Sequence, residues 1–340
     1  MKKIIIATDM WYPEVNGVVR ATEMILPYLE KQGFEVKIIH PGLFLSVPLF
    51  LYPEMRISFF TKRKIKKIIE DFKPDFIHIV TEWTVGTAVR SVCLQKNLKF
   101  TASYHGNISK YAEFYAGIKS RLLFNFVYDR FRKFHKPAAL NMVCSDSLKE
   151  ELEDHGFSNL TICPMGVDSD LFRRNPNSPQ QKNNFKKPVF AYFGRIAKEK
   201  SVEEFFECNL PGTKLVIGDG PLRKKFENKY KKGTKFLGYK SGQDLVDWLS
   251  VCDVFVFPSR TETFGLVILE AMACGVPVAA HNVMGPKDII TSGVDGILDE
   301  NLEKAALACL GISRDKCREK ALKFSWEKSA DYFIDNLVKV

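Results

Sequence analysis

TETFGLVILEAMACGVPV (residues 261–278) is an apolar, helix-forming stretch with one carboxylate, Glu270, in its middle. Leucine, isoleucine, alanine and methionine favour a helix, and Gly275 followed by Pro277 supplies a stop. The positions three and four away from Glu270 are all apolar: Leu266, Val267, Ala273 and Cys274. An isolated carboxylate is costly to bury. We therefore predict that Glu270 faces a ligand-sized cavity or, as the alternative, pairs with a buried arginine or lysine.

Length and composition place this helix in a chain of two domains. A chain of 340 residues exceeds the size at which one core usually keeps growing. It has no unbroken apolar segment near the bilayer-spanning length, and MKKIIIATD reaches an acidic residue too early for a signal peptide. The eight cysteines lack the paired spacing of zinc or redox sites. These features predict a cytoplasmic protein with reduced cysteines.

The net charge of +10 indicates an anionic partner. Two segments, 61–73 and 119–136, combine basic residues with aromatic and aliphatic ones. This pattern is typical of a helix on an anionic membrane surface, and equally of a solvated basic helix. No nucleic-acid-binding motif accompanies the charge. We expect peripheral attachment to the inner face of the membrane, and no nucleic-acid partner.

Short apolar runs alternate with helix-like segments along the whole chain. The runs expected as strands are KKIIIAT, EVKIIHP, FIHIV, KFTASYH and NMVCS, then VFAYFG, TKLVIG, KFLG, VFVFP and VPVAA. This alternation predicts two doubly wound parallel sheets of the α/β class. A polar interruption separates the two sets of strands. The expected division is an N-terminal domain 1–172, a linker 173–187, a second domain 188–324, and a C-terminal helix 325–340 that returns to the first domain.

Ligands of such folds bind beyond the carboxyl ends of the strands, so the functional residues are expected in the loops there. After the first strand, Asn16 and Gly17 open a helix whose amides suit an anion. His105 ends another strand and is the histidine best placed to bind a ligand. The other histidines are expected in the core or on the surface: His40 and His78 in the core, and His135, His155 and His281 on the surface or in linkers.

In the second half, Arg195 and Lys200 follow a strand and suit a diphosphate. Exposed surface charge is the alternative for Lys200. Gly218 and Gly220 lack the third glycine of a dinucleotide fingerprint, so a tight turn explains them and no nicotinamide site is predicted.

The opening stretch itself combines an anion site with two carboxylates. The amides of Gly265 and Leu266 lie at the expected helix start, where phosphate oxygens bind. Glu262 is better suited to accept hydrogen bonds from sugar hydroxyls beside the phosphates. Glu270, two turns further along, reaches a second set of hydroxyls.

Together these motifs resemble the retaining glycosyltransferases of family 4, which have the GT-B fold. The resemblance spans nearly the whole chain: the NGV loop, SYHGN, MGVDSDLF, YFGRIAKEKS, GDGPL, FLGY, CDVFVFPS, and the pair Glu262 and Glu270. It implies two Rossmann-like domains that face each other across a cleft.

Carried over by position, the resemblance assigns roles to single residues. Glu270 would hold the ribose hydroxyls of a nucleotide sugar and Glu262 its sugar hydroxyls, while His105 would contact the transferred sugar or the acceptor. Gly17 would approach the donor phosphates from the first domain. The diphosphate would be held by two cations and three amides: Arg195, Lys200, and the amides of Phe264, Gly265 and Leu266. Gly218 and Tyr239, in GDGPL and FLGY, are assigned to the donor site as well.

The resemblance further implies a hexosyltransferase that retains the anomeric configuration and needs no metal, with the nucleotide sugar as co-substrate and no other cofactor. The leaving diphosphate would accept the acceptor's proton, with Arg195 and the helix amides stabilising its charge. A glycosidase that uses Glu262 and Glu270 as its two carboxylates is the rival enzyme. It is disfavoured because it would give no role to the residues suited to bind phosphate.

Within the family, TEWTVGTAVRS and SYHGNISKYAEFY most resemble mannosyl, glucosyl or sulfoquinovosyl transferases with lipid acceptors, which favours a membrane glycerolipid. The alternatives are a polysaccharide or lipopolysaccharide acceptor, and a catalytically silent nucleotide-sugar-binding protein. The choice between UDP and GDP donors stays open.

Overall fold

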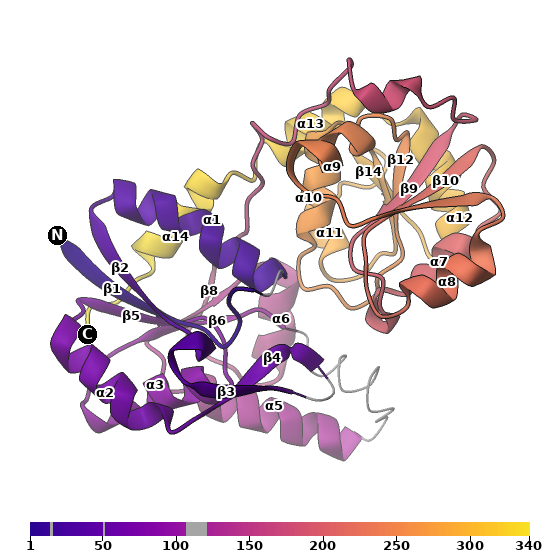
Figure 1. The fold of residues 1–340 in the computed structure, drawn as a ribbon. Coiled ribbons are helices and arrows are strands. Elements are labelled where there is room, and N and C mark those ends of the chain that lie inside the picture. Colours follow the sequence, from indigo (N-terminus) through magenta and orange to yellow (C-terminus); the bar gives the residue numbers. More distant parts are fainter. Residues whose placement is uncertain (14–15, 50–51, 107–120) are drawn as a thin grey trace. The chain divides into compact units, whose positions relative to one another are not determined.

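The computed structural model describes residues 1–13, 16–49, 52–106 and 121–340, and they form two compact units (Figure 1). Unit 1 contains the described residues up to 165 together with 326–340, and unit 2 contains 166–325. The chain therefore leaves unit 1 once and returns to it for a final helix. Each unit is built around one six-stranded sheet.

The sheet of unit 1 is parallel, in the order β2-β1-β5-β6-β7-β8. Ile4–Ala7 of β1 are fully buried, as expected for a parallel strand that is covered on both faces. Helices α1 and α14 cover one face, and α2, α3 and α5 the other (Figure 1). The elements are β1 (Lys2–Ala7), α1 (Gly17–Lys31), β2 (Phe34–Ile39), η1 (Pro41–Leu43), β3 (Leu45–Leu49), β4 (Tyr52–Phe59), α2 (Thr61–Phe72), β5 (Phe76–Ile79), α3 (Thr84–Gln95), β6 (Thr101–Tyr104), α5 (Arg121–His135), β7 (Leu140–Val143), α6 (Asp146–Asp154), β8 (Leu160–Ile162) and α14 (Trp326–Asp335).

The sheet of unit 2 is also parallel, in the order β11-β10-β9-β12-β13-β14. Strand order reverses between β9 and β12, so the loops after these two strands diverge and leave room for a ligand at their carboxyl ends. The elements are η2 (Pro179–Lys182), β9 (Val189–Phe193), η3 (Lys198–Lys200), α7 (Val202–Glu207), β10 (Thr213–Ile217), α8 (Arg223–Tyr230), β11 (Thr234–Gly238), α9 (Gly242–Leu249), β12 (Val254–Phe257), α10 (Leu266–Ala273), β13 (Val278–Ala280), α11 (Pro286–Ile289), β14 (Gly296–Leu298), α12 (Leu302–Ala308), η4 (Cys309–Gly311) and α13 (Arg314–Ala321).

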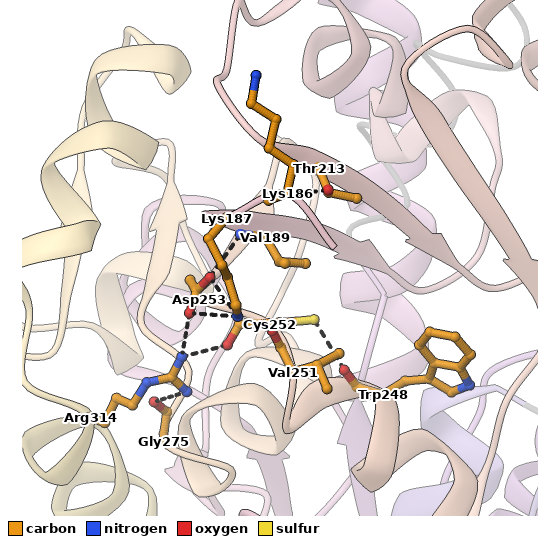
Figure 2. A network of polar contacts seen from close by, with 10 residues as sticks. All are labelled: Lys186, Lys187, Val189, Thr213, Trp248, Val251, Cys252, Asp253, Gly275 and Arg314. Atoms are coloured by element: carbon orange, nitrogen blue, oxygen red, sulfur yellow. Dashed lines mark hydrogen bonds and ion pairs between the residues drawn. The ribbon is translucent and has the colours of Figure 1, made fainter. Parts of the chain in front are cut away.

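Asp253 ties together the amino-terminal edge of this second sheet (Figure 2). Its carboxylate accepts from the amide of Val189 at 2.8 Å, from Lys187 at 3.0 Å and from Arg314 at 3.0 Å. Arg314 also donates to the carbonyl of Cys252 at 2.6 Å. One carboxylate thus fixes the starts of β9 and β12 to α13. This network lies at the sheet edge opposite to the carboxyl ends of the strands.

The expected linker 173–187 lies within unit 2. The backbone N–H of Asn175 donates to Ser250 Oγ at 2.8 Å. Ser178 Oγ donates to the carbonyl of Asp247 at 2.9 Å. These contacts hold the segment against the end of α9. The division between the units falls at 165/166 and 325/326, where the sequence led us to expect 172 and 324.

All ten runs expected as strands contain strands of the structure. Four further strands lack a sequence expectation: β3, β4, β8 and β14. The segment 119–136 contains α5, but its first two residues lie outside the described part, as do the residues of SYHGNISKYAEFY from 107 on. Among the helices of the described ranges, none combines the length and the apolar character needed to cross a membrane.

Candidate functional site

Unit 2 brings two of the predicted donor-binding residues into contact. Lys200 follows β9 and Glu262 follows β12, the two strands that flank the reversal of strand order. Their side chains form an ion pair and are only 19% and 16% exposed. Ser259 Oγ donates to the same Glu262 carboxylate at 3.4 Å. A cation and a carboxylate therefore lie side by side at the carboxyl edge of the sheet.

Helix α10 begins beside this pair. Gly265 is its N-cap residue and has a φ of 99°, a conformation that favours glycine. Leu266 opens the helix, and Phe264 is buried with 3% of its surface exposed. Because the first amides of a helix have no intrahelical acceptor, this end of α10 is suited to an anion.

Glu270 lies on the open side of α10. Its helix is otherwise buried, except for Leu266 and Val267, one turn earlier. Glu270 itself is half-buried. The burial of Cys274, and next the charge of Glu270, raise the pKa of the Cys274 thiol to about 12. The predicted helix is confirmed, and Glu270 shares its partly exposed side with Leu266 and Val267.

Arg195 and Gly218 belong to two loops that interlock at the ends of β9 and β10. A Cβ at Gly218 would lie 1.9 Å from the carbonyl oxygen of Gly194, so only glycine allows this approach. The carbonyl of Arg195 accepts a hydrogen bond from the buried Tyr192 hydroxyl at 2.6 Å. Gly218 thus supports the loop that carries Arg195, the tight turn expected from the sequence. Tyr239, just after β11, is 60% exposed.

One contact of Glu262 was missed from the sequence. A Cβ at Gly285 would lie 2.9 Å from the Cβ of Glu262 and 2.9 Å from the carbonyl oxygen of Phe264. Gly285 therefore fixes the loop 262–264 from the side of α11. The dipeptide Gly285-Pro286 is a turn signal that could have indicated this position.

Unit 1 contains the other two predicted site residues. Gly17 is exposed and begins α1, and the side chain of Asn16 accepts from the amides of Val18 and Val19 at 3.0 Å each. The Asn16 cap thus satisfies two of the amides that were expected to meet an anion. The role of Gly17 stays a prediction.

His105 lines a cavity of unit 1 between the sheet and helices α1 and α14. The cavity has a volume of about 50 Å³. His78 and Ser103 line it as well, and His78 Nε2 lies 2.9 Å from Ser103 Oγ. Burial, and next the charge of His135, lower the pKa of His105 to about 4. His105 is therefore neutral at physiological pH.

A second feature missed from the sequence is the carboxylate of Asp9, which is 1% exposed. It accepts hydrogen bonds from two threonine hydroxyls and three amides at the start of α3: Thr81, Thr84, and the amides of Trp83, Val85 and Gly86. Asp9 thus holds the loop before Gly17 against the neighbouring strand end. Burial raises its pKa despite these donors.

Two histidines expected at the surface are instead buried. His135 is 1% exposed and His281 is fully buried. His135 Nε2 lies 3.0 Å from Glu82, and His281 Nε2 lies 2.8 Å from Glu204. Each therefore pairs with a carboxylate instead of meeting solvent. Within the described residues, no cluster of three or more histidine, cysteine or acidic side chains is arranged to hold a metal ion.

Comparison with known proteins gives two adjacent matches. Residues 15–171 match the model of Glycosyltransferase Family 4, and residues 174–323 match that of Glycosyl transferases group 1. The GDP-mannose-dependent alpha-mannosyltransferase of Corynebacterium glutamicum is 25% identical, over 87% of this chain and 76% of that protein. Sulfoquinovosyl transferase SQD2 of Arabidopsis thaliana is 29% identical, over 83% of this chain and 60% of that protein. Alpha-monoglucosyldiacylglycerol synthase of Acholeplasma laidlawii is 25% identical, over 81% of this chain and 79% of that protein.

Solved structures give the same fold. Sucrose-phosphate synthase from Thermosynechococcus elongatus superposes with a TM-score of 0.77 at 19% identity, over 98% of both chains. Anabaena Alr3699/HepE, solved with UDP and glucose, gives a TM-score of 0.73 at 17% identity, over 97% of this chain and 98% of that one. The predicted GT-B fold class is confirmed.

Proposed function

Because this chain belongs to the family 4 glycosyltransferases, we propose that it transfers a hexose from a UDP- or GDP-sugar to the hydroxyl of a membrane glycerolipid. The transferase class follows from the two family matches. The lipid acceptor draws support from relatives whose names specify one, such as alpha-monoglucosyldiacylglycerol synthase.

The observation that carries the proposal is the pairing of Lys200 with Glu262 beside the start of α10. A sugar diphosphate presents anionic oxygens next to hydroxyl donors. Lys200, Arg195 and the amides of Phe264, Gly265 and Leu266 suit the former. Glu262 suits the hydroxyls of the sugar, and Glu270 those of the ribose. Gly218 and Tyr239 complete the proposed donor contacts, and Gly17 and His105 the contacts from unit 1.

The ion pair also gives Lys200 a dual role in this proposal. Without donor, its ammonium balances Glu262, so neither half-buried charge is left isolated. When a diphosphate binds, the same ammonium stabilises the charge that develops as the glycosidic bond breaks, while Glu262 becomes available to the sugar hydroxyls. Replacing Glu262 would thus alter both the sugar contact and the position of Lys200.

We further propose that transfer retains the anomeric configuration and requires no metal ion. The cations Arg195 and Lys200 would neutralise the leaving diphosphate, and that diphosphate would take the acceptor's proton. Two measurements test this: the anomeric coupling constant in the NMR spectrum of the product, and the transfer rate after exhaustive treatment with a chelator. An inverted product, or a rate that is lost on chelation and restored by one metal ion, would contradict it.

The function itself is tested by nucleotide release from a panel of UDP- and GDP-sugars, with and without anionic liposomes that contain diacylglycerol or phosphatidylinositol. We expect release from one donor that depends on the acceptor lipid. Glu262→Gln should lose this release, while Glu207→Gln, an exposed carboxylate of the same unit, serves as the matched control. Turnover indifferent to lipid would move the acceptor to a polysaccharide or lipopolysaccharide. Binding of a nucleotide sugar without any turnover would establish the catalytically silent reading.

A further inference from the structure

The antiparallel hairpin of β3 and β4 has its apolar side chains on the outside. Leu45 pairs with Phe59 across the two strands, and these side chains are 69% and 42% exposed. Val47, two residues after Leu45 and therefore on the same face, is 45% exposed. Ser58, on the opposite face, is buried, and its amide donates to Thr84 of α3 at 3.0 Å. The hairpin thus reverses the usual pattern of an apolar inner and a polar outer face.

Phe60 extends this apolar face towards α2. Its side chain is 90% exposed, although its backbone has a φ of 54°, in the left-handed region. That conformation is unfavourable for a bulky side chain. A strained backbone that presents an aromatic ring to solvent contributes nothing to the core of unit 1. Such strain is typical of positions kept for a function.

Helix α2 supplies charge next to the hairpin. Lys64 donates to the carbonyl of Leu43 at 2.8 Å, which joins the first turn of the helix to the residues just before β3. Lys64 is exposed, and so are four further basic residues of α2: Lys62, Arg63, Lys66 and Lys67. The apolar residues of α2 point the other way, because Ile65 and Ile69 are 0% and 4% exposed and belong to the core.

The burial of Ile65 and Ile69 limits what α2 can do at a membrane. A helix that lies in the interface buries its own apolar face among the lipids. Helix α2 has already buried that face in unit 1, so in the folded protein it offers its charged side chains, with five exposed cations and the exposed Glu70 and Asp71. The expectation that residues 61–73 lie on an anionic membrane surface stays a prediction, but α2 itself can supply charge and no free apolar face. Any apolar contribution must come from neighbouring residues.

We propose that the outer face of the β3–β4 hairpin and Phe60 insert into an anionic bilayer, with α2 as the electrostatic contact. The inserting residues are Leu45, Val47, Phe59 and Phe60. The combination of exposed large apolar side chains with adjacent cations matches a surface of anionic headgroups over hydrocarbon. This inference rests on the proposed function only in that the acceptor is a membrane lipid.

Sedimentation with vesicles tests the proposal without any need for catalysis. The probe is vesicles of phosphatidylcholine with about one third phosphatidylglycerol, a level chosen to give the strong negative surface potential of anionic membranes. Phe60→Asn removes the ring while keeping a residue that tolerates the left-handed conformation. Leu45→Ser removes the apolar side chain that pairs with Phe59 across the hairpin. Each should weaken binding about tenfold, since burying one large apolar side chain corresponds to at least that factor.

The matched control is Leu310→Ser in unit 2, an exposed leucine of 45% relative accessibility outside the hairpin. Its binding should equal that of the unchanged protein. If Phe60→Asn and Leu45→Ser bind as tightly as this control, or if the unchanged protein does not bind these vesicles, the proposal is overturned.

Tryptophan fluorescence separates insertion from electrostatic adsorption. Phe60→Trp should shift its emission to shorter wavelength on vesicles and be quenched by lipids brominated on their acyl chains. Binding without either change would overturn insertion. Binding of the nucleotide sugar in the absence of vesicles reports separately on the proposed function, because Leu45 and Phe60 are outside the donor residues. Loss of vesicle binding with unchanged nucleotide-sugar binding supports the hairpin, and absent nucleotide-sugar binding with intact vesicle binding counts against the enzyme alone.

Discussion

Replacing Gly285 with alanine tests whether the loop before α11 positions Glu262. The backbone of Gly285 has a φ of 87° and a ψ of −77°, and a Cβ there would lie 2.9 Å from the Cβ of Glu262. Gly293 is the matched control: it has a similar φ of 84°, but a Cβ there meets no atom within 4 Å. A positive φ is unfavourable for alanine, and this strain is present in both variants. Only Gly285→Ala adds the overpacking, worth about 1–3 kcal/mol.

Urea unfolding and nucleotide release measure the two consequences. Both variants should unfold at lower urea than the unchanged protein, with Gly285→Ala destabilised by about 1–3 kcal/mol more than Gly293→Ala. Nucleotide release should fall by up to about 100-fold in Gly285→Ala alone, since a displacement near 1 Å at a reacting centre has that effect. Equal unfolding midpoints and equal rates in the two variants would refute the contact between Gly285 and Glu262 as the device that sets the loop.

Glu270→Ala should weaken donor use by about 10- to 100-fold, because charged hydrogen bonds contribute about 1.5–3 kcal/mol; unchanged nucleotide affinity and rate would remove its assignment to the ribose. His105→Ala should lower the transfer rate more than the affinity for nucleotide, whereas an equal loss of both in kinetics and calorimetry would indicate a structural role. Burial, with some effect of His105, lowers the folded pKa of His78 to about 3, and that of His105 is about 4. Below about pH 6.5 the unfolded chain therefore binds a proton at each of these two histidines, whereas the folded chain does not. The free energy of unfolding should decrease as the pH is lowered, by up to about 1.4 kcal/mol per pH unit for each histidine. Equal urea midpoints at pH 7 and pH 5 would contradict this.

The strands and helix α10 could be predicted because their signals are local. Parallel strands that are buried on both faces appear as continuous apolar runs, as in KKIIIAT and VFVFP. The apolar helix around Glu270 likewise carries its own start and stop signals. Two-sided burial also explains why two parallel sheets could be expected from the sequence. The order of the strands could not, because it depends on which strands pair in space.

The environments of several charged residues could not be predicted, because their partners are distant along the chain. His135 and His281 look like surface residues in sequence, yet they pair with Glu82 and Glu204, which are 53 and 77 positions away. Lys200 meets Glu262 across 62 positions. No periodic pattern reports such pairs. They arise from strand order, which brings loops of one sheet edge together.

The hairpin illustrates a different limit. Alternation along β3 and β4 separates Leu45 and Val47 from Ser46, but it does not say which face is inside. The default rule would bury the leucine and the valine. In the structure the serine face is turned inward, towards α3, and sequence reasoning has no local signal for this reversal.

The return of α14 to unit 1 has a consequence for biosynthesis. Trp326 and Phe333 are each 4% exposed, and with Ser329 they form the wall of the cavity that faces α1. On the ribosome, the sheet of unit 1 emerges well before this wall, and the whole of unit 2 is translated in between. Unit 2 is continuous from 166 to 325, so it can reach its native state while unit 1 still waits for its final helix. Unit 1 is thus synthesised first but completed last. Until α14 packs against it, the apolar surface around α1 is accessible to chaperones.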